Sequence, residues 1–111
     1  MGGTASNALT LRDLEDSRTI DELKREGPAI AEVLVKEMVI SRECGKLGST
    51  TRVGIPEQTL RLLRAVGETQ YCSMKDGRRF LSDSVANALR DMGYKNPRVK
   101  CGWFSIRARG L

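Results

Sequence analysis

Glycine and proline divide this chain into short segments, and each segment has room for one helix or one strand. The strongest interruptions lie at Gly27-Pro28, Pro56, Gly67, Asp76-Gly77 and Gly93. Glycine frees the backbone at turns and helix ends, whereas proline begins a helix but interrupts one that it falls within. Because the chain has 111 residues, these segments predict a single domain built from several short elements.

The first half of the chain is predicted to be helical. Residues 9–16 predict a short helical turn, and residues 19–22 have the spacing of a capping box that opens a second short helix. Gly27-Pro28 ends that helix, and Pro28 begins a longer one over 28–43, because the first helical position needs no N–H. The β-branched residues within 33–40 leave a strand there as an open alternative.

The second half alternates between strand and helix patterns. We expect, in chain order, a strand over 51–55, a helix over 57–66, strands over 69–74 and 78–81 joined by a hairpin turn at Asp76-Gly77, a helix over 83–92, and a strand or tight hairpin over 98–109. This is the order of a βαββαβ, ferredoxin-like unit. The alternative is a winged-helix arrangement with 98–109 as the wing. The sequence therefore predicts an α+β domain over 9–111, in which helices within 9–45 pack on the βαββαβ unit over 50–109.

The apolar pattern within 98–109 changes parity halfway. Every second residue from Val99 to Trp103 is apolar, whereas beyond Trp103 the apolar positions alternate from Phe104 to Ala108. A bulge or turn near Gly102 restores one inward apolar face. The same bulge or turn places four basic residues together on the outward face, namely Arg98, Lys100, Arg107 and Arg109.

Positive charge is concentrated in the second half. The chain carries a net charge of +5, but residues 1–55 hold eight Lys or Arg against nine Asp or Glu, whereas residues 56–111 hold eleven against five. From Lys95 to the C-terminal residue there are five basic residues and no acidic one. Such an asymmetry favours attraction to polyanions, and it does not bear on the fold.

The basic residues of this half are interleaved with aromatic ones, a composition typical of nucleic-acid binding. Arg and Lys neutralise phosphates, and aromatic side chains stack on unpaired bases, which favours RNA over DNA. We expect the binding residues to be Lys75, Arg78, Arg79, Lys95, Arg98, Lys100, Trp103, Arg107 and Arg109. The alternative function is a protein-interaction adaptor that binds an acidic protein, or a regulator that forms a homodimer through the helix over 28–43.

The sequence also argues against an enzyme. It contains no histidine, which removes the Ser-His-Asp and Cys-His systems and the most common general base at neutral pH. The three cysteines, Cys44, Cys72 and Cys101, are too far apart for a local zinc site, and no glycine-rich phosphate loop is present. We therefore expect no catalytic residues, no metal and no cofactor.

The N-terminus has no early basic residue and no apolar core of signal-peptide length, and no stretch reaches the roughly 20 apolar residues of a membrane span. We therefore expect a cytoplasmic or nuclear protein without integral membrane contact. Gly2 and Ser6 fit the short N-myristoylation pattern. No basic segment follows closely to supply a second membrane signal, which argues against N-myristoyl anchoring at Gly2. Because residues 1–8 are small and polar, we expect them to be a flexible tail.

Overall fold

The structure, a computed structural model, describes residues 10–44 and 50–111. The elements in this part of the chain are α2 (Leu11–Cys44), β1 (Thr51–Gly54), α3 (Glu57–Gly67), α4 (Met74–Asp91), β2 (Arg98–Cys101) and β3 (Ser105–Arg109). They form a small α+β domain of three helices and one three-stranded antiparallel sheet, as the sequence predicts at the level of fold class. The predicted tail over 1–8, with Gly2, lies outside the described residues.

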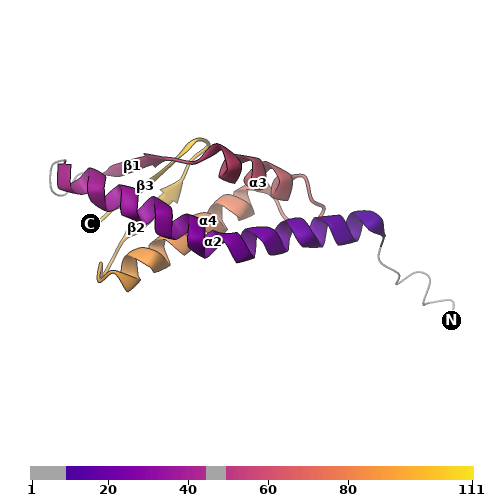
Figure 1. The fold of residues 1–111 in the computed structure, drawn as a ribbon, viewed down its shortest axis with the longest axis horizontal. Coiled ribbons are helices and arrows are strands. Elements are labelled where there is room, and N and C mark those ends of the chain that lie inside the picture. Colours follow the sequence, from indigo (N-terminus) through magenta and orange to yellow (C-terminus); the bar gives the residue numbers. More distant parts are fainter. Residues whose placement is uncertain (1–9, 45–49) are drawn as a thin grey trace.

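The sheet has the strand order β1-β3-β2, so the C-terminal strand lies in the middle. On one side of the sheet, β1 packs against α2 and β2 packs against α4 (Figure 1). The core between the helices and the sheet includes Leu34 and Met38 of α2, Leu81 and Leu89 of α4, and Ile106 of β3, all fully buried. The sheet thus has one apolar face on the helices and one face exposed to solvent.

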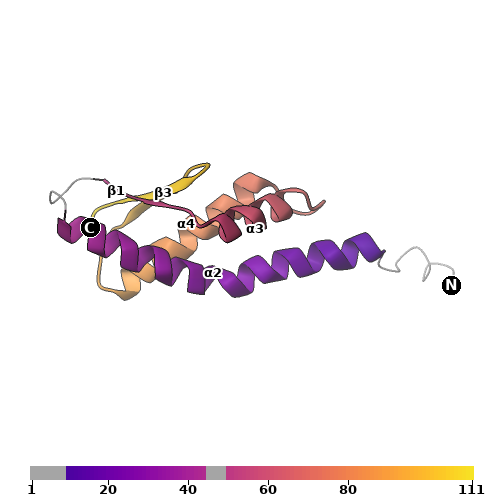
Figure 2. The same cartoon turned by 45° about the horizontal axis from the view of Figure 1, so that its top comes forward.

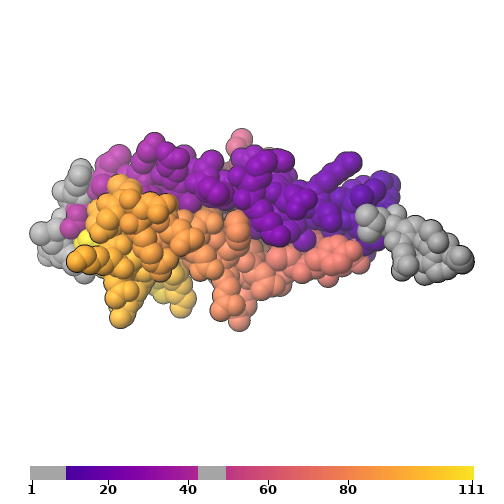
Figure 3. Space-filling model, turned by 90° about the horizontal axis from the view of Figure 1, so that it is seen from below, coloured from indigo at the N-terminus to yellow at the C-terminus, as the bar shows by residue number. Residues whose placement is uncertain are grey.

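The first helix is longer than predicted. Residues 11–44 form one continuous helix, so the predicted break into 9–16, a second short helix and 28–43 is wrong, and 33–40 is helical rather than a strand. Pro28 lies inside the helix, where it removes one main-chain hydrogen bond and favours a bend. Figure 2 shows α2 changing direction near its middle. Figure 3 shows α4 lying along α2, which supplies the packing that keeps the helix continuous through Pro28.

Gly27 allows α2 and α4 to pack closely. It is buried, and a Cβ atom placed on it would lie 2.6 Å from Cε2 of Phe80 in α4. We expect Gly27→Ala to destabilise the fold by about 1–3 kcal/mol, because this clash outweighs the gain in helix propensity of about 1 kcal/mol. Urea unfolding measures the change. Gly54→Ala, whose Cβ meets nothing within 4 Å, is the control, and equal effects of the two variants would contradict the packing role.

The prediction of two strands within 69–81 is wrong. Residues 74–91 form one helix, and the βαββαβ order is therefore not observed. The helix begins with a capping box: the Ser73 hydroxyl accepts a hydrogen bond from the Asp76 N–H, and the Asp76 carboxylate accepts one from the Ser73 N–H. Asp76-Gly77 is thus the first turn of α4 and not a hairpin turn. Ser82, just before the helix predicted over 83–92, lies inside α4, where its hydroxyl donates to the Arg78 carbonyl.

The N-terminal half of α2 is held to the loop between α3 and α4. The Tyr71 hydroxyl donates a 2.6 Å hydrogen bond to the Asp13 carboxylate, and the Gln70 N–H donates to Asp16. The hydrogen bond from Tyr71, followed by that from the Thr10 N–H, lowers the pKa of Asp13 from 3.8 to about 2. The bond also raises the pKa of Tyr71.

This contact predicts an acid-dependent contribution to stability. Because the folded pKa of Asp13 lies below its ordinary value, the stabilisation is fully present above pH 3.8 and is lost as the pH falls through about 2. Asp13→Asn is therefore expected to unfold at lower urea concentration than the wild type at pH 5 and to match it near pH 2. Tyr71→Phe removes the donor that lowers the pKa of Asp13 most. Its urea midpoint should also fall below that of the wild type at pH 5, but by less than the midpoint of Asp13→Asn. A difference independent of pH would contradict the prediction.

Candidate nucleic-acid interface

The solvent-exposed face of the sheet is basic. Thr51 and Val53 of β1 and Ile106 and Ala108 of β3 are buried, because alternate residues of a strand point to opposite faces. The residues between them point outward, as do Arg98 and Lys100 on β2, whereas Val99 and Cys101 of β2 pack against the core. Five of the outward residues are basic and exposed: Arg52, Arg98, Lys100, Arg107 and Arg109. We call these five residues the basic sheet face.

The register of the sheet places like charges directly opposite one another. Arg107 in the central strand lies opposite Arg52 of β1 on one side and Lys100 of β2 on the other. Arg109 lies opposite Arg98. Residues directly opposite in an antiparallel pair have Cβ atoms about 4.5–5.5 Å apart, and like charges at these positions destabilise the sheet. The fold therefore sustains an electrostatic cost that a bound polyanion would relieve.

No acidic side chain compensates these charges within the described residues. The ion pairs found in 10–44 and 50–111 join neighbouring residues of α2 or α3: Arg12–Asp16, Arg25–Glu26, Lys36–Glu32 and Arg61–Glu57. On the basic sheet face, the Arg109 Nε donates a 3.0 Å hydrogen bond to the Thr50 hydroxyl, which is neutral. Apart from this bond, no side chain among the described residues pairs with the guanidinium and ammonium groups of this face.

Two hollows lie on the basic sheet face. One has a volume of about 410 Å³ and is lined by Thr50, Arg98, Val99, Lys100, Arg107 and Arg109. The other, of about 270 Å³, is lined by Arg52, Lys100, Gly102, Ser105 and Arg107. Lys100 and Arg107 line both, so these two side chains separate the hollows. Each hollow offers several cationic donors to one anionic group such as a phosphate.

The hairpin between β2 and β3 ends in two exposed aromatic residues. The Gly102 N–H donates to the Ser105 carbonyl at 2.8 Å, which closes the turn as the parity change predicts. Trp103 and Phe104 occupy its tip, with 66% and 71% of their surfaces exposed. The guanidinium carbon of Arg78 lies 4.4 Å from the centre of a Trp103 ring, in the range of a cation–π contact. Side chains from α4 and from the hairpin thus meet here.

The structure brings together part of the predicted site. Arg98, Lys100, Arg107 and Arg109 share the outer face of the sheet, and Arg78 contacts Trp103. Lys75 and Arg79 lie on α4 rather than on a hairpin strand, and Lys95 lies in the connection from α4 to β2; none of the three lines either basic hollow.

Sequence reasoning missed Arg52. It alternates with the buried Thr51 and Val53, so the strand pattern at 51–55 already indicates that its side chain points outward. Its place in the row with Arg107 and Lys100 depends on the pairing of β1 with β3, which joins residues more than 50 positions apart.

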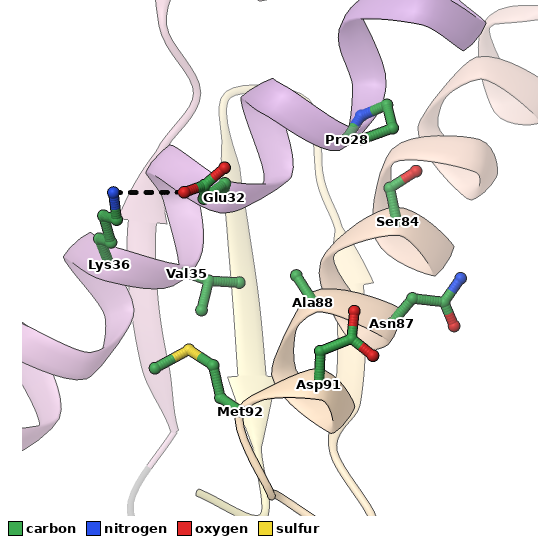
Figure 4. Close-up of a pocket in the computed structure, with 9 residues that line it drawn as sticks. All are labelled: Pro28, Glu32, Val35, Lys36, Ser84, Asn87, Ala88, Asp91 and Met92. Atoms are coloured by element: carbon green, nitrogen blue, oxygen red, sulfur yellow. Dashed lines mark ion pairs between the residues drawn. The ribbon is translucent and has the colours of Figure 1, made fainter.

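A larger hollow of about 580 Å³ lies between α2 and α4 (Figure 4). The apolar side chains of Val35, Ala88 and Met92 face one another across it, and Glu32 is paired with Lys36 at 3.4 Å on its rim. Its lining combines apolar groups with two carboxylates, those of Glu32 and Asp91, and one ammonium group, that of Lys36. This hollow therefore lacks the concentration of one charge that marks the basic sheet face.

Within 10–44 and 50–111 there is no group of three or more His, Cys, Asp or Glu side chains placed to hold a metal ion. None of the helices in this part of the chain is both long enough and apolar enough to span a bilayer.

Comparison of the chain with models of known protein families, with curated proteins and with solved structures gives no significant match. The functional proposal therefore depends on the chain's own residues and their arrangement.

Proposed function

We propose that this protein binds nucleic acid, and RNA in preference to DNA, by placing phosphate groups against the basic sheet face. The observation that carries the proposal is the row of Arg52, Arg107 and Lys100 across three adjacent strands, together with the opposed pair of Arg98 and Arg109. Fixed like charges at such short separation attract a flexible polyanion, and its condensed counterions are released on binding.

Arginine dominates this face, which favours phosphate as the bound group. Four of its five residues are arginine, and a guanidinium presents donors in a planar fork that matches phosphate oxygens. A nucleic-acid strand carries one such group per nucleotide, so it can occupy both basic hollows in succession. An acidic protein would need carboxylates at matching positions on a folded surface.

The element order supports a winged-helix arrangement, which we propose as the finer description of the fold. A helix, a strand, two helices and a two-stranded hairpin follow one another, with the last strand in the middle of the sheet. In such an arrangement the second helix of the α3–α4 pair faces nucleic acid and the β2–β3 hairpin is the wing. Lys75 and Arg79 are exposed on α4, which packs on the opposite face of the sheet, so their positive charge lies apart from the basic sheet face.

The hairpin tip supports RNA as the ligand. Trp103 and Phe104 are exposed beside the basic sheet face, and aromatic side chains bind nucleic acid by stacking on unpaired bases. Loops and bulges of folded RNA present such bases, whereas duplex DNA keeps its bases stacked inside the helix.

A binding assay tests the proposal. Fluorescence anisotropy is measured with a labelled RNA hairpin that has a single-stranded loop, with the DNA hairpin of equal sequence, and with duplex DNA, from about 50 to 200 mM salt. We expect the RNA hairpin to bind most tightly, with log K falling linearly against log salt by about 0.7–0.9 per phosphate contact. No binding to any of the three at the lowest salt would contradict the function, and equal displacement by polyglutamate would favour an acidic protein partner.

A second candidate, self-association through α2, has one observation in its favour. Val33 and Ile40 lie two turns apart on α2 and are both exposed, although the other large apolar residues in this region of the helix are buried or partly buried. Light scattering across micromolar concentrations distinguishes the two candidates. A strict monomer would contradict self-association and leave RNA binding unaffected.

A further inference from the structure

A small hollow lies beneath the tip of the β2–β3 hairpin, between the hairpin and the helices α3 and α4. It has a volume of about 210 Å³, and its walls include Leu63 and Arg64 of α3, Met74 and Arg78 of α4, and Trp103 and Phe104 of the hairpin. This volume is below the roughly 300–1,000 Å³ of pockets that enclose whole small ligands. It suits a single flat ring inserted from the surface.

Aromatic stacking organises this hollow. The Arg78 guanidinium lies 4.4 Å from a Trp103 ring, and among the described residues none accepts a hydrogen bond from its buried Nη1 atom. Stacking therefore holds this guanidinium in place. Because Trp103 remains 66% exposed despite this contact, part of its indole surface is available to a second flat group.

The charges around the hollow are of one sign. Arg64 and Arg78 are the ionisable residues in its lining, and no carboxylate is among the lining residues. A ligand that fits these walls combines a flat aromatic ring with a nearby negative charge. An unpaired nucleotide has this composition, since its base is planar and its phosphate is anionic.

We infer that this hollow holds one unpaired base of the RNA whose phosphates contact the basic sheet face; the inference rests on the proposed function. The two surfaces adjoin. Gly102 and Ser105 line the 270 Å³ basic hollow, and they flank Trp103 and Phe104 in the chain. A strand of RNA can therefore pass from the phosphate contacts over the hairpin tip to the stacked base.

Trp103 is the single tryptophan of the chain, so its fluorescence reports on this hollow alone. The wild-type protein is titrated with a hairpin RNA and with the same RNA whose loop nucleotides lack their bases. We expect the base-containing loop to quench the emission and the abasic loop to leave it unchanged, because only a base can stack on the indole. Equal quenching by the two RNAs, or none by either, would overturn the inference.

The RNA affinities of substituted proteins give a second test of the base site. Trp103→Ala is expected to weaken binding by about 5- to 150-fold, the range for one stacked base, without changing the salt slope. Trp103→Phe keeps an aromatic ring and should retain most of the affinity. Tyr71→Ala, which removes an exposed aromatic residue from the α3–α4 loop, is the control; it loses the hydrogen bond to Asp13 but should leave the affinity for RNA unchanged.

The outcomes separate this inference from the function on which it rests. If RNA binds with a strong salt dependence but Trp103→Ala binds as tightly as the wild type, the base site is wrong and the phosphate interface stands. If RNA does not bind at all, both are wrong. Should Trp103→Ala fail to fold, the fluorescence of the wild-type protein and the affinity of Trp103→Phe still decide.

Discussion

Replacement of Lys100 and Arg107 by threonine is expected to weaken RNA binding by about 25- to 60-fold at about 0.1 M salt, because each phosphate contact contributes roughly five- to eightfold there. This factor follows from a slope of about 0.7–0.9 in log K against log salt for each contact, taken from 1 M salt as reference. The two side chains line both basic hollows, so their loss removes charge from each. The salt slope should fall by about two, one for each lost contact.

The same double variant is expected to be more stable than the wild type. Arg107 lies opposite both Arg52 and Lys100, so two like-charge pairs disappear, each worth about 0.2–1 kcal/mol. Threonine also suits a strand better than lysine does. A loss of binding together with a rise in the urea midpoint identifies charges that serve a ligand rather than the fold.

The control for this variant removes two positive charges elsewhere. Arg18 and Lys24 are exposed on α2, so Arg18→Ala with Lys24→Ala gives the same change in net charge. We expect this control to bind RNA nearly as tightly as the wild type. If it weakens binding as much as the sheet variant does, the attraction depends on net charge alone and the basic sheet face is not the interface.

Leu81→Ala is expected to destabilise the domain by about 2–5 kcal/mol, the usual cost of truncating a buried leucine. Leu81 is 0% exposed and lies in the core cluster with Leu34 of α2 and Ile106 of β3. The truncation removes apolar contacts and leaves a cavity that the surrounding helices and sheet fill only in part. Urea unfolding with a fitted midpoint and slope measures the change.

Leu11→Ala is the matched control, because Leu11 is 73% exposed on α2. The same chemical change there should alter the free energy of unfolding by less than about 0.5 kcal/mol. Similar values for the two variants would contradict the position of Leu81 in the core, and with it the assignment of 78–81 to α4.

Local signals in the sequence conflict at the start of α4. Asp76-Gly77 is a strong hairpin dipeptide, but the spacing of Ser73 and Asp76 is also that of a capping box. Neighbouring residues alone are compatible with both a hairpin turn and a helix start, and tertiary contacts decide between these two structures. As a helix, 74–91 buries Leu81, Val85 and Leu89 on one side, which no two short strands of this length would do.

The continuity of α2 is likewise a tertiary effect. Gly27-Pro28 is expected to end a helix when only neighbouring residues are considered, since proline lacks an N–H and glycine favours helix ends. In the fold, Gly27 lets Phe80 of α4 approach closely, and Leu23 and Ala31 are buried on either side of it. Packing against α4 stabilises both halves of the helix and outweighs the local penalty at Pro28.

The local pattern of the strands over 51–55 and 98–109 and of α3 could be predicted from neighbouring residues alone. The alternation of residues in 98–109 and the turn near Gly102 place Arg98, Lys100, Arg107 and Arg109 on one face, because the side-chain period of a strand is two. Three other features depend on tertiary contacts: the addition of Arg52 through β1, the helical state of 74–81 and the contact of Arg78 with Trp103. These features join residues far apart in the chain, and the free energy that selects them comes from burial and strand pairing rather than from local preference.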